Sequence, residues 1–399
     1  MKDLIDKSES YIFPTYTRLP IVLTRGEGMK VWDSEGKDYL DFVSGIAVLN
    51  VGHRHPRVVE AITQQSKLLM HVSNLYYSEP QITLAELLVT HSFADKVFFC
   101  NSGAEANEAA IKLARKVFKD KGESNRYHII TMENSFHGRT MATLSATAQK
   151  KFHHGFDPLL DGFSYVPFNN AQAVQETLTA DTCAVMVEPI QGEGGVNCPS
   201  PDYLKDLRTI CDEYGLILIF DEVQVGMGRT GTLFAHQHYG AEPDIMTLAK
   251  ALAGGMPIGA MLANKKCAPS FSPSTHASTF GGNLLSTAAG VATIEALLNE
   301  NILDNCQKMG KYFYAKLCSL KDKHPVIKKV KGKGLLLGVE IGCEGNAIVR
   351  ECMRRGILIN CTMGNILRFI PPLIIKEKEV DSLIKTLDEL FTQKQSSPS

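Results

Sequence analysis

The sequence predicts an α/β fold, in which a mainly parallel sheet is wrapped by helices and joined to a smaller α+β domain. Two observations lead to this prediction. Runs such as Cys183–Val187 and Leu216–Phe220 are short and continuously apolar, as expected of central strands that are covered on both faces. From about residue 97 such runs alternate with amphipathic helical patterns, which is typical of a parallel sheet. The length of 399 residues exceeds one ordinary hydrophobic core, so we expect two domains.

The beginning of the chain predicts a short polar helix, an extended segment and a strand pair within residues 1–50. Val31–Asp33 and Tyr39–Phe42 flank a Ser-Glu-Gly-Lys turn, which is a hairpin signal. Apolar residues recur at helical spacing in 56–70 and 83–89.

The large domain is predicted to span residues 51–294. Its strands are expected at 97–100, 128–132, 183–187, 216–220 and 245–249. One helix should follow 101–104, and another should run from about Pro201 to Gly215, a residue suited to a left-handed cap. A helix of small residues is expected at 285–299.

The small domain is predicted to combine residues 1–50 with 295–399. Helices are expected at 303–320 and 347–355, strands at 335–341, 357–359 and 366–370, and an amphipathic helix near the end. The polar tail 393–399 is expected to be disordered.

Composition and charge argue against several classes of function. A net charge of -1 offers no attractive field for nucleic acid or an anionic membrane, and the chain contains no run of eighteen apolar residues. The first residues do not form a signal peptide, and ten cysteines without a CxxC pair suggest free thiols in a reducing cytoplasm. The pairs His53/His55 and His236/His238 lack a nearby third ligand, so we predict no metal site.

Five polar clusters follow predicted strands and should therefore meet at one edge of the sheet, where ligands bind in open α/β sheets. Taken alone, a lysine or an aspartate at a strand end is usually a surface residue or a helix cap. Their convergence at one edge is what favours a site. The clusters are Ser102-Gly103-Ala104, Phe136–Arg139, Glu188 with Glu193, Asp221–Gln224, and Lys250.

The chemistry of these side chains fits pyridoxal phosphate. A desolvated lysine such as Lys250 can lose its proton near neutral pH and form a Schiff base. The helix that begins after Ser102 can bind a phosphate, Phe136 can stack on a ring, and Asp221 can keep a pyridinium nitrogen protonated.

A second motif favours a different function. Gly226–Gly231 matches G-x-G-x-x-G, the signature of dinucleotide binding, and would suit a nicotinamide-dependent oxidoreductase. However, a poor helix start follows the motif, and no acidic ribose-binding position lies about twenty residues later.

Longer motifs resemble the class III, fold-type-I pyridoxal-phosphate aminotransferases, and among them the acetylornithine aminotransferases. The resemblance covers nearly the whole chain. Its motifs include FFCNSGAEANEAAIKLARK (98–116), SFHGRT (135–140), EPIQGEGGV (188–196), LIFDEVQVGMGRTG (218–231), TLAKALAGGMPIGA (247–260), STFGGN (278–283) and LRFIPPL (367–373).

The resemblance implies a role for each site residue. Lys250 would be the Schiff-base lysine and proton shuttle, and Asp221 would pair with the ring nitrogen. Further implied cofactor contacts are Val223 and Phe136 on the ring, Gln224 at its hydroxyl, Glu188, the phosphate turn Ser102-Gly103-Ala104, and Thr279 of a second subunit in a homodimer. Implied substrate contacts are Arg139 at the side-chain carboxylate, Arg368 at the α-carboxylate, the gating Glu193, and Ser278.

The implied reaction exchanges an amino group between N-acetylornithine and 2-oxoglutarate in arginine synthesis. Succinyldiaminopimelate, ornithine and 4-aminobutyrate remain alternative donors, and a non-catalytic ligand-binding relative is a further alternative. The chain departs from the common motifs at Ala104, where threonine is frequent, at Met256 and at Leu284.

Overall fold

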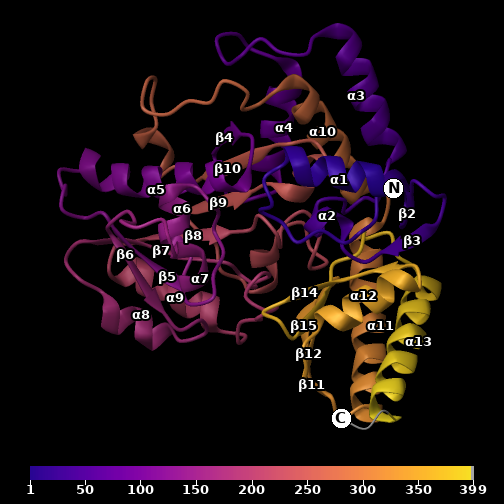
Figure 1. Cartoon of the computed structure of the whole chain (residues 1–399). Coiled ribbons are helices and arrows are strands. Elements are labelled where there is room, and N and C mark those ends of the chain that lie inside the picture. Colours follow the sequence, from indigo (N-terminus) through magenta and orange to yellow (C-terminus); the bar gives the residue numbers. More distant parts are fainter. Residues whose placement is uncertain (397–399) are drawn as a thin grey trace.

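The centre of the molecule is a seven-stranded sheet in which β10 alone runs against its neighbours. The computed structural model describes residues 1–396 (Figure 1). The strands lie in the order β4 (Lys96–Cys100), β10 (Gly259–Ala263), β9 (Ile245–Leu248), β8 (Ile217–Asp221), β7 (Thr182–Val187), β5 (His128–Met132) and β6 (Phe163–Val166). The parallel strands β9, β8, β7 and β5 were predicted from their apolar runs, whereas β6 and β10 were not.

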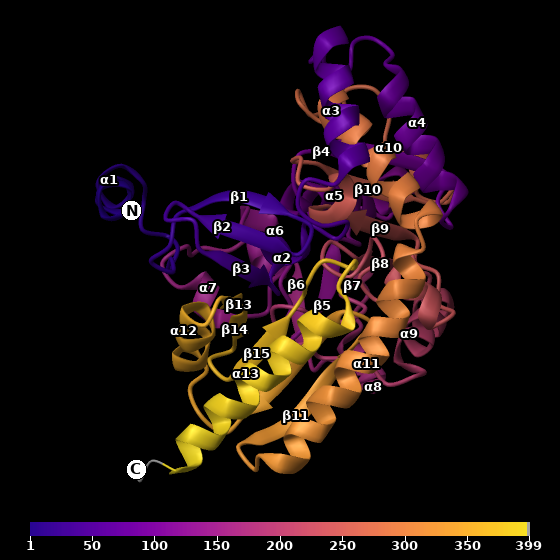
Figure 2. The same ribbon diagram turned by 90° about the vertical axis from the view of Figure 1, so that its right-hand side faces the viewer.

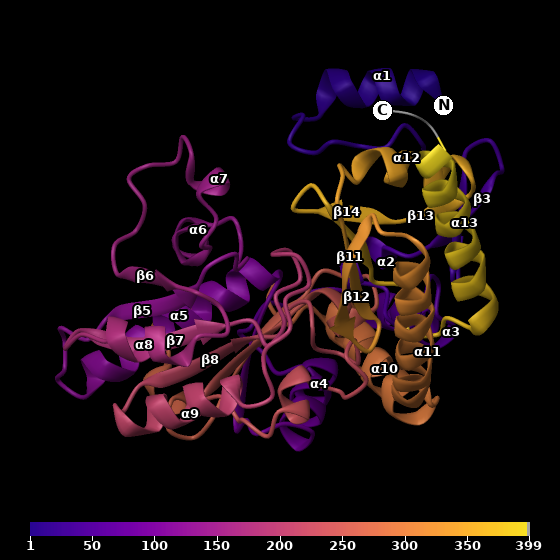
Figure 3. The same cartoon turned by 90° about the horizontal axis from the view of Figure 1, so that it is seen from below.

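Alternate residues of the central strands face two separate hydrophobic layers. Met186 and Ile219 pack towards α5 (Gly103–Asp120), while Val187 and Phe220 pack towards α9 (Tyr203–Glu213). Figure 3 shows the strands lying between these two helices. Because both faces are covered, the strands need apolar residues at every position, which explains their continuous runs.

Further helices surround this sheet. They are α3 (Pro56–Leu68), α4 (Glu79–Thr90), α6 (Met141–Ala146), α7 (Lys150–His153), α8 (Ala171–Thr177) and α10 (Leu284–Asn299), with short 3-10 turns at Ala235–His238, Lys250–Ala253 and Ala268–Ser270. Within residues 1–396 no helix has both the length and the apolar character that crossing a membrane requires.

Two smaller sheets are built from the ends of the chain. One has the order β1 (Leu23–Glu27), β2 (Lys30–Asp33), β3 (Asp38–Asp41) and β13 (Ile357–Leu358), and the other β11 (Ile327–Lys333), β12 (Leu336–Ile341), β15 (Ile366–Phe369) and β14 (Asn360–Thr362). Beside them lie α1 (Lys2–Tyr11), α2 (Ser44–Ala47), α11 (Ile302–Lys323), α12 (Asn346–Arg354) and α13 (Glu377–Ser396). Figure 2 shows α11 and α13 side by side.

The parallel pairing of β13 with β3 joins residues from both chain ends in one sheet. The predicted hairpin is confirmed, because β2 and β3 pair antiparallel across the turn at Ser34–Lys37. The boundaries of the two domains, 51–294 and 1–50 with 295–399, stay a prediction.

The predicted disorder of 393–399 is wrong for its first part. Helix α13 continues to Ser396, and residues 397–399 lie outside the described residues. Leu387, Leu390 and Phe391 are buried and attach the preceding turns to the core. The polar residues that follow can continue the helix because its earlier turns are already fixed by packing.

Candidate active site

A pocket of about 430 Å³ lies at the carboxyl ends of the parallel strands and brings together most of the predicted site residues. Its lining includes Ser102, Gly103, Ala104, Phe136, Arg139, Glu188, Glu193, Asp221, Val223, Gln224 and Lys250. Arg368 on β15 contacts two of these, Glu193 and Gln224. The expectation that these clusters share one edge of one sheet is therefore confirmed.

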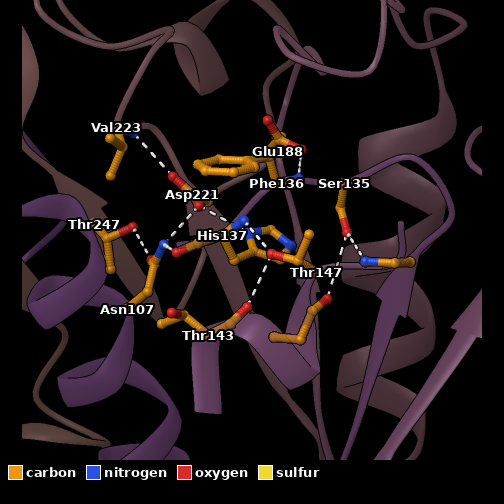
Figure 4. A network of polar contacts seen from close by, with 12 residues as sticks. Asn107, Ser135, Phe136, His137, Thr143, Thr147, Glu188, Asp221, Val223 and Thr247 are labelled. Carbon is orange, nitrogen blue, oxygen red and sulfur yellow. Dashed lines mark hydrogen bonds and ion pairs between the residues drawn. The ribbon is translucent and has the colours of Figure 1, made fainter. Parts of the chain in front are cut away.

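Asp221 ends β8 and is held by donors on both carboxylate oxygens. Its Oδ2 accepts hydrogen bonds from His137 Nδ1 at 2.8 Å and from Asn107 Nδ2 at 2.7 Å. Its Oδ1 accepts one from the backbone N–H of Val223 at 3.0 Å. Figure 4 shows these three contacts.

Lys250 follows β9 at the same edge and is half-buried in the pocket. Its backbone has φ of 42°, a left-handed conformation that is uncommon for a residue with a side chain. Burial lowers the pKa of the Lys250 amino group from its ordinary value, although the nearby Glu193 charge opposes the shift. A lowered pKa increases the fraction of neutral amine, the form that attacks a carbonyl.

The start of α5 provides a place for an anion. Ser102 caps this helix, and its Oγ accepts from the N–H of Glu105 at 3.2 Å. The first N–H groups of a helix have no partner inside it, so those of Gly103 and Ala104 are available to an anionic ligand. A side chain at position 103 would collide with Val223, because its Cβ would lie 2.7 Å from Val223 Cγ1.

Phe136 and Glu188 line the opposite part of the pocket. The N–H of Phe136 donates to Glu188 Oε2 at 3.0 Å, and the phenyl ring meets Phe152 edge-on at 5.8 Å. Burial, reinforced by the charge of Asp221, raises the pKa of Glu188 well above its ordinary value. Glu188 thus resists ionisation in the pocket that it shares with Asp221.

Glu193, Gln224 and Arg368 form a second, connected group. Arg368 Nη1 donates to Glu193 Oε1 at 2.6 Å and to Gln224 Oε1 at 3.2 Å, while Gln224 Nε2 donates to Glu193 at 3.2 Å. Burial alone would raise the pKa of Glu193, but the charges of Arg368 and Lys250 outweigh it and lower the pKa to about 2. Glu193 and Arg368 are therefore an ion pair near neutral pH.

Three predicted site residues, Arg139, Ser278 and Thr279, lie outside the buried part of the pocket. Arg139 is exposed at the pocket, with its guanidinium 3.9 Å from the centre of the Phe152 ring. Ser278 and Thr279 line a neighbouring cavity, and Ser278 Oγ accepts a hydrogen bond from Asn101 Nδ2, a residue of the main pocket, at 3.2 Å.

Sequence reasoning missed the role of Asn107 and gave none to His137. Asn107 is 1% exposed on the buried face of α5, among Ala106, Ala109 and Ala110. A lone polar residue on an otherwise apolar helix face is the signal that could have revealed it, because a buried amide requires partners.

The glycine-rich segment Gly226–Gly231 does not open a helix. Arg229 within it is fully buried and donates to the carbonyl oxygens of Leu335 and Pro371 and to Asn50. The segment is thus a packed connection between sheets, and it lacks the free helix terminus that a dinucleotide would need.

Comparison with known proteins identifies the family. Residues 11–391 match the family described as aminotransferase class-III. The chain belongs to the class III aminotransferases. A curated acetylornithine aminotransferase of Caldanaerobacter subterraneus subsp. tengcongensis is 52% identical, over 98% of this chain and 99% of that protein. One from Methanocaldococcus jannaschii is 51% identical, over 98% of each chain.

Solved structures of other class III aminotransferases have the same fold. The ornithine aminotransferase of Toxoplasma gondii ME49 superposes with a TM-score of 0.95 at 34% identity, covering 99% of this chain and 95% of that one. The acetylornithine aminotransferase of Elizabethkingia anophelis gives 0.89 at 35% identity, covering 98% and 99%. This chain is accordingly an α/β aminotransferase, and its family implies pyridoxal phosphate as the cofactor.

Proposed function

We propose that this class III aminotransferase moves an amino group from N-acetylornithine to 2-oxoglutarate, giving N-acetylglutamate 5-semialdehyde and glutamate in arginine synthesis. The names of its curated relatives support this donor, since those at 46–52% identity are acetylornithine aminotransferases. The observation that carries the proposal is the ion pair between Glu193 and Arg368 in the pocket.

The residues of the pocket fit pyridoxal 5'-phosphate. The N–H groups of Gly103 and Ala104, at the start of α5, would hold its phosphate, and Phe136 and Val223 would contact its ring. Asp221 would bind the ring nitrogen. When bound, the cofactor withdraws electrons from the substrate carbon that gains or loses the amino group.

Lys250 has two tasks in the proposed reaction. Its amine, made less basic by burial, is the nucleophile that attaches the cofactor to the chain. The same amine lies in the pocket where, beside a bound substrate, it could take a proton from the reacting substrate carbon and return it. Asp221, fixed by its donors, would pair with the cofactor's ring nitrogen.

The ion pair suits a donor that reacts through a terminal amine. Such an amine has no carboxylate on its own carbon, so an unpaired Arg368 would be a buried charge without a partner, which is costly. Glu193 supplies that partner at 2.6 Å. The donor's carboxylate, several bonds away, would then bind Arg139, whose charge the Phe152 ring does not neutralise.

The same group explains how 2-oxoglutarate would bind afterwards. Its carboxylate next to the keto group would take Arg368 from Glu193, and its far carboxylate would bind Arg139. Gln224 contacts both members of the ion pair, so its amide can remain bonded to Glu193 as Arg368 changes partner.

An acylated donor suits the pocket better than free ornithine does. Ornithine carries a second ammonium, which would need an anionic partner. Among the described lining residues the carboxylates are Glu188, Glu193 and Asp221. Glu193 is paired with Arg368, and Asp221 would be taken up by the ring nitrogen. Burial, the main cause, raises the pKa of Glu188 and so disfavours its charged form.

The donor is tested by measuring kcat/KM for N-acetylornithine, succinyldiaminopimelate, ornithine and 4-aminobutyrate with 2-oxoglutarate as acceptor. We expect N-acetylornithine to exceed ornithine by at least about tenfold, the cost of one poorly paired charge. Ornithine turnover that equals or exceeds that of N-acetylornithine would overturn the assignment of the donor and leave the aminotransferase chemistry intact.

We also propose that the enzyme is a homodimer in the cytoplasm. Large apolar side chains are exposed in 68–77, with Tyr77 at 96%, and Phe280 at 59% contacts His71 of that segment. An exposed apolar patch of this kind marks an interface, and Thr279 beside it would reach the partner's phosphate site. Sedimentation equilibrium should give twice 43.9 kDa, and a fully active monomer would contradict the dimer.

A further inference from the structure

Asp221 receives a hydrogen bond from a residue that the reaction described so far does not use. Asn107 lies on α5, a separate element from β8, and its Nδ2 is 2.7 Å from Asp221 Oδ2. Asn107, His137 and Asp221 are exposed by 1%, 2% and 3%, so water scarcely reaches these contacts. A hydrogen bond to a carboxylate is strong when it is buried, because competing solvent is absent.

The orientation of the Asn107 amide is fixed by a third element. Thr247 on β9 donates from Oγ1 to Asn107 Oδ1 at 2.7 Å. With its oxygen bound to a hydroxyl, the amide turns its NH2 group towards Asp221, and the second hydrogen goes to the carbonyl oxygen of His137 at 2.7 Å. Figure 4 shows this sequence of contacts from Thr247 through Asn107 to Asp221.

The two side-chain donors on Asp221 Oδ2 differ in kind. His137 can gain or lose a proton, and its Nε2 is buried without a hydrogen-bond partner among the described residues. Asn107 cannot titrate, so it donates to Asp221 at every pH. Donors to a carboxylate favour its ionised form over its protonated form.

We propose that Asn107 is a positioning residue for the aminotransferase reaction: it holds Asp221 turned so that Asp221 Oδ1 can serve the cofactor's ring nitrogen. Oδ2 is occupied by Asn107 and His137, whereas Oδ1 has one protein donor, Val223 N, and keeps room for a second. Thr247 takes part by fixing the amide. The inference rests on the proposed use of pyridoxal phosphate.

The alternative is that Asn107 only fills space between α5 and the sheet. The two roles differ in what a substitution changes. Asn107→Leu keeps a side chain of similar size and removes the donor to Asp221. If Asn107 only fills space, this substitution should lower the stability of the protein and leave the electronic state of the cofactor unaltered. If Asn107 positions Asp221, the substitution should alter that electronic state.

The experiment is a pH titration of the absorbance of the bound cofactor, in the wild type and in Asn107→Leu loaded with pyridoxal phosphate. Without the Asn107 donor, the Asp221 carboxylate would be a stronger base and would take a larger share of the proton that it shares with the ring nitrogen. The ring would then carry less of the positive charge that opposes protonation of the neighbouring Lys250 nitrogen. We expect the pH midpoint of the absorbance change to rise by about half a pH unit or more, because part of the effect of one hydrogen bond to a charged group would reach the Lys250 nitrogen. Cofactor affinity of the apoprotein should also fall.

Two valine variants provide a matched comparison. Thr247→Val removes the hydroxyl that orients Asn107 and should raise the midpoint by a smaller amount. Thr293→Val removes another buried hydroxyl, which donates to Ala289 O in its own helix, and should leave the midpoint unchanged. Thermal unfolding of the three apoproteins measures the structural cost of each change.

An unchanged midpoint in folded Asn107→Leu overturns the inference, as does an equal shift in Thr293→Val. If Asn107→Leu does not fold, Thr247→Val decides: a raised midpoint supports the inference and an unchanged one overturns it. Failure of the proposed function is a different result, since the wild type itself would then show no cofactor absorbance.

Discussion

The two ends of the pocket are built on different physical principles. At the cofactor end, Asp221 is held by Asn107, His137 and a backbone N–H, all within a buried part of the sheet. At the carboxylate end, Glu193 and Arg368 hold each other in an ion pair. The partners at the first end have no need to change, whereas those at the second must separate when a substrate carboxylate arrives.

The difference follows from what each end must recognise. A ring nitrogen is the same in both halves of a transamination, so a fixed carboxylate serves every turnover. A terminal-amine donor and a 2-oxo acid differ by one carboxylate beside the reacting carbon. An ion pair accommodates both because its members are neutralised either by each other or by the substrate. Substitutions at the cofactor end should therefore lower the turnover of every substrate equally. Substitutions in the ion pair should lower the turnover of some substrates more than that of others.

The largest loss is expected from Lys250→Ala. Without this amine the pocket has neither the nucleophile for the cofactor nor the proton carrier, so kcat should fall by about 10⁴-fold. Steady-state rates with each donor, together with the cofactor's absorbance, measure the effect. Near-normal turnover in this variant would mean that another group carries the proton.

Asp221→Asn should have the next largest effect. The neutral amide cannot keep the ring nitrogen protonated, and kcat should fall by about 10²- to 10³-fold, similarly with donor and acceptor. Separate half-reaction rates check this equality. A loss of rate in only one half-reaction would show that the cofactor end also distinguishes between substrates.

Glu188→Gln provides a matched contrast, because it neutralises a carboxylate in the same pocket. Burial, and then the charge of Asp221, raises the pKa of Glu188, which favours the neutral form of the native group. The glutamine carbonyl can still accept from Phe136 N, so activity should change by less than about threefold. A loss as large as that of Asp221→Asn would contradict the division of roles between the two acids.

The pH dependence should show no titration of the ion pair in the working range. The pKa of Glu193 is lowered to about 2, since the charges of Arg368 and Lys250 outweigh the effect of burial. A lowered pKa means that the pairing is complete above the ordinary carboxyl value and weakens only as pH falls towards 2. KM for 2-oxoglutarate should thus show no Glu193-linked step between pH 6 and 9.

Much of the cofactor end of the pocket could be predicted from sequence, and the reason is physical. Continuous apolar runs identify covered parallel strands, and the residues that follow them, such as Asp221 and Lys250, must meet at one edge. The residues that hold Asp221 in place were harder to predict. Asn107 lies inside a helix and Thr247 inside a strand. The sequence there does not show which residue a single polar side chain will contact.

Other features depended on tertiary contacts that no local pattern encodes. Strand β10 is short and runs antiparallel between β4 and β9, so alternation of strands and helices does not predict it. The ion pair joins Glu193 to Arg368 across 175 positions of sequence, and family resemblance suggested it where spacing could not. Arg229, fully buried and without a carboxylate partner among residues 1–396, lay in a motif that suggested a dinucleotide site.

The most direct test of the two-ended pocket is the ratio of half-reaction rates for N-acetylornithine and glutamate in Glu193→Gln. Removing the carboxylate leaves Arg368 unpaired when the terminal-amine donor binds, but not when the α-carboxylate of glutamate binds. The ratio should fall by roughly 30-fold, through loss of the donor rate with the glutamate rate maintained. An unchanged ratio, with both rates lowered equally, would contradict the account.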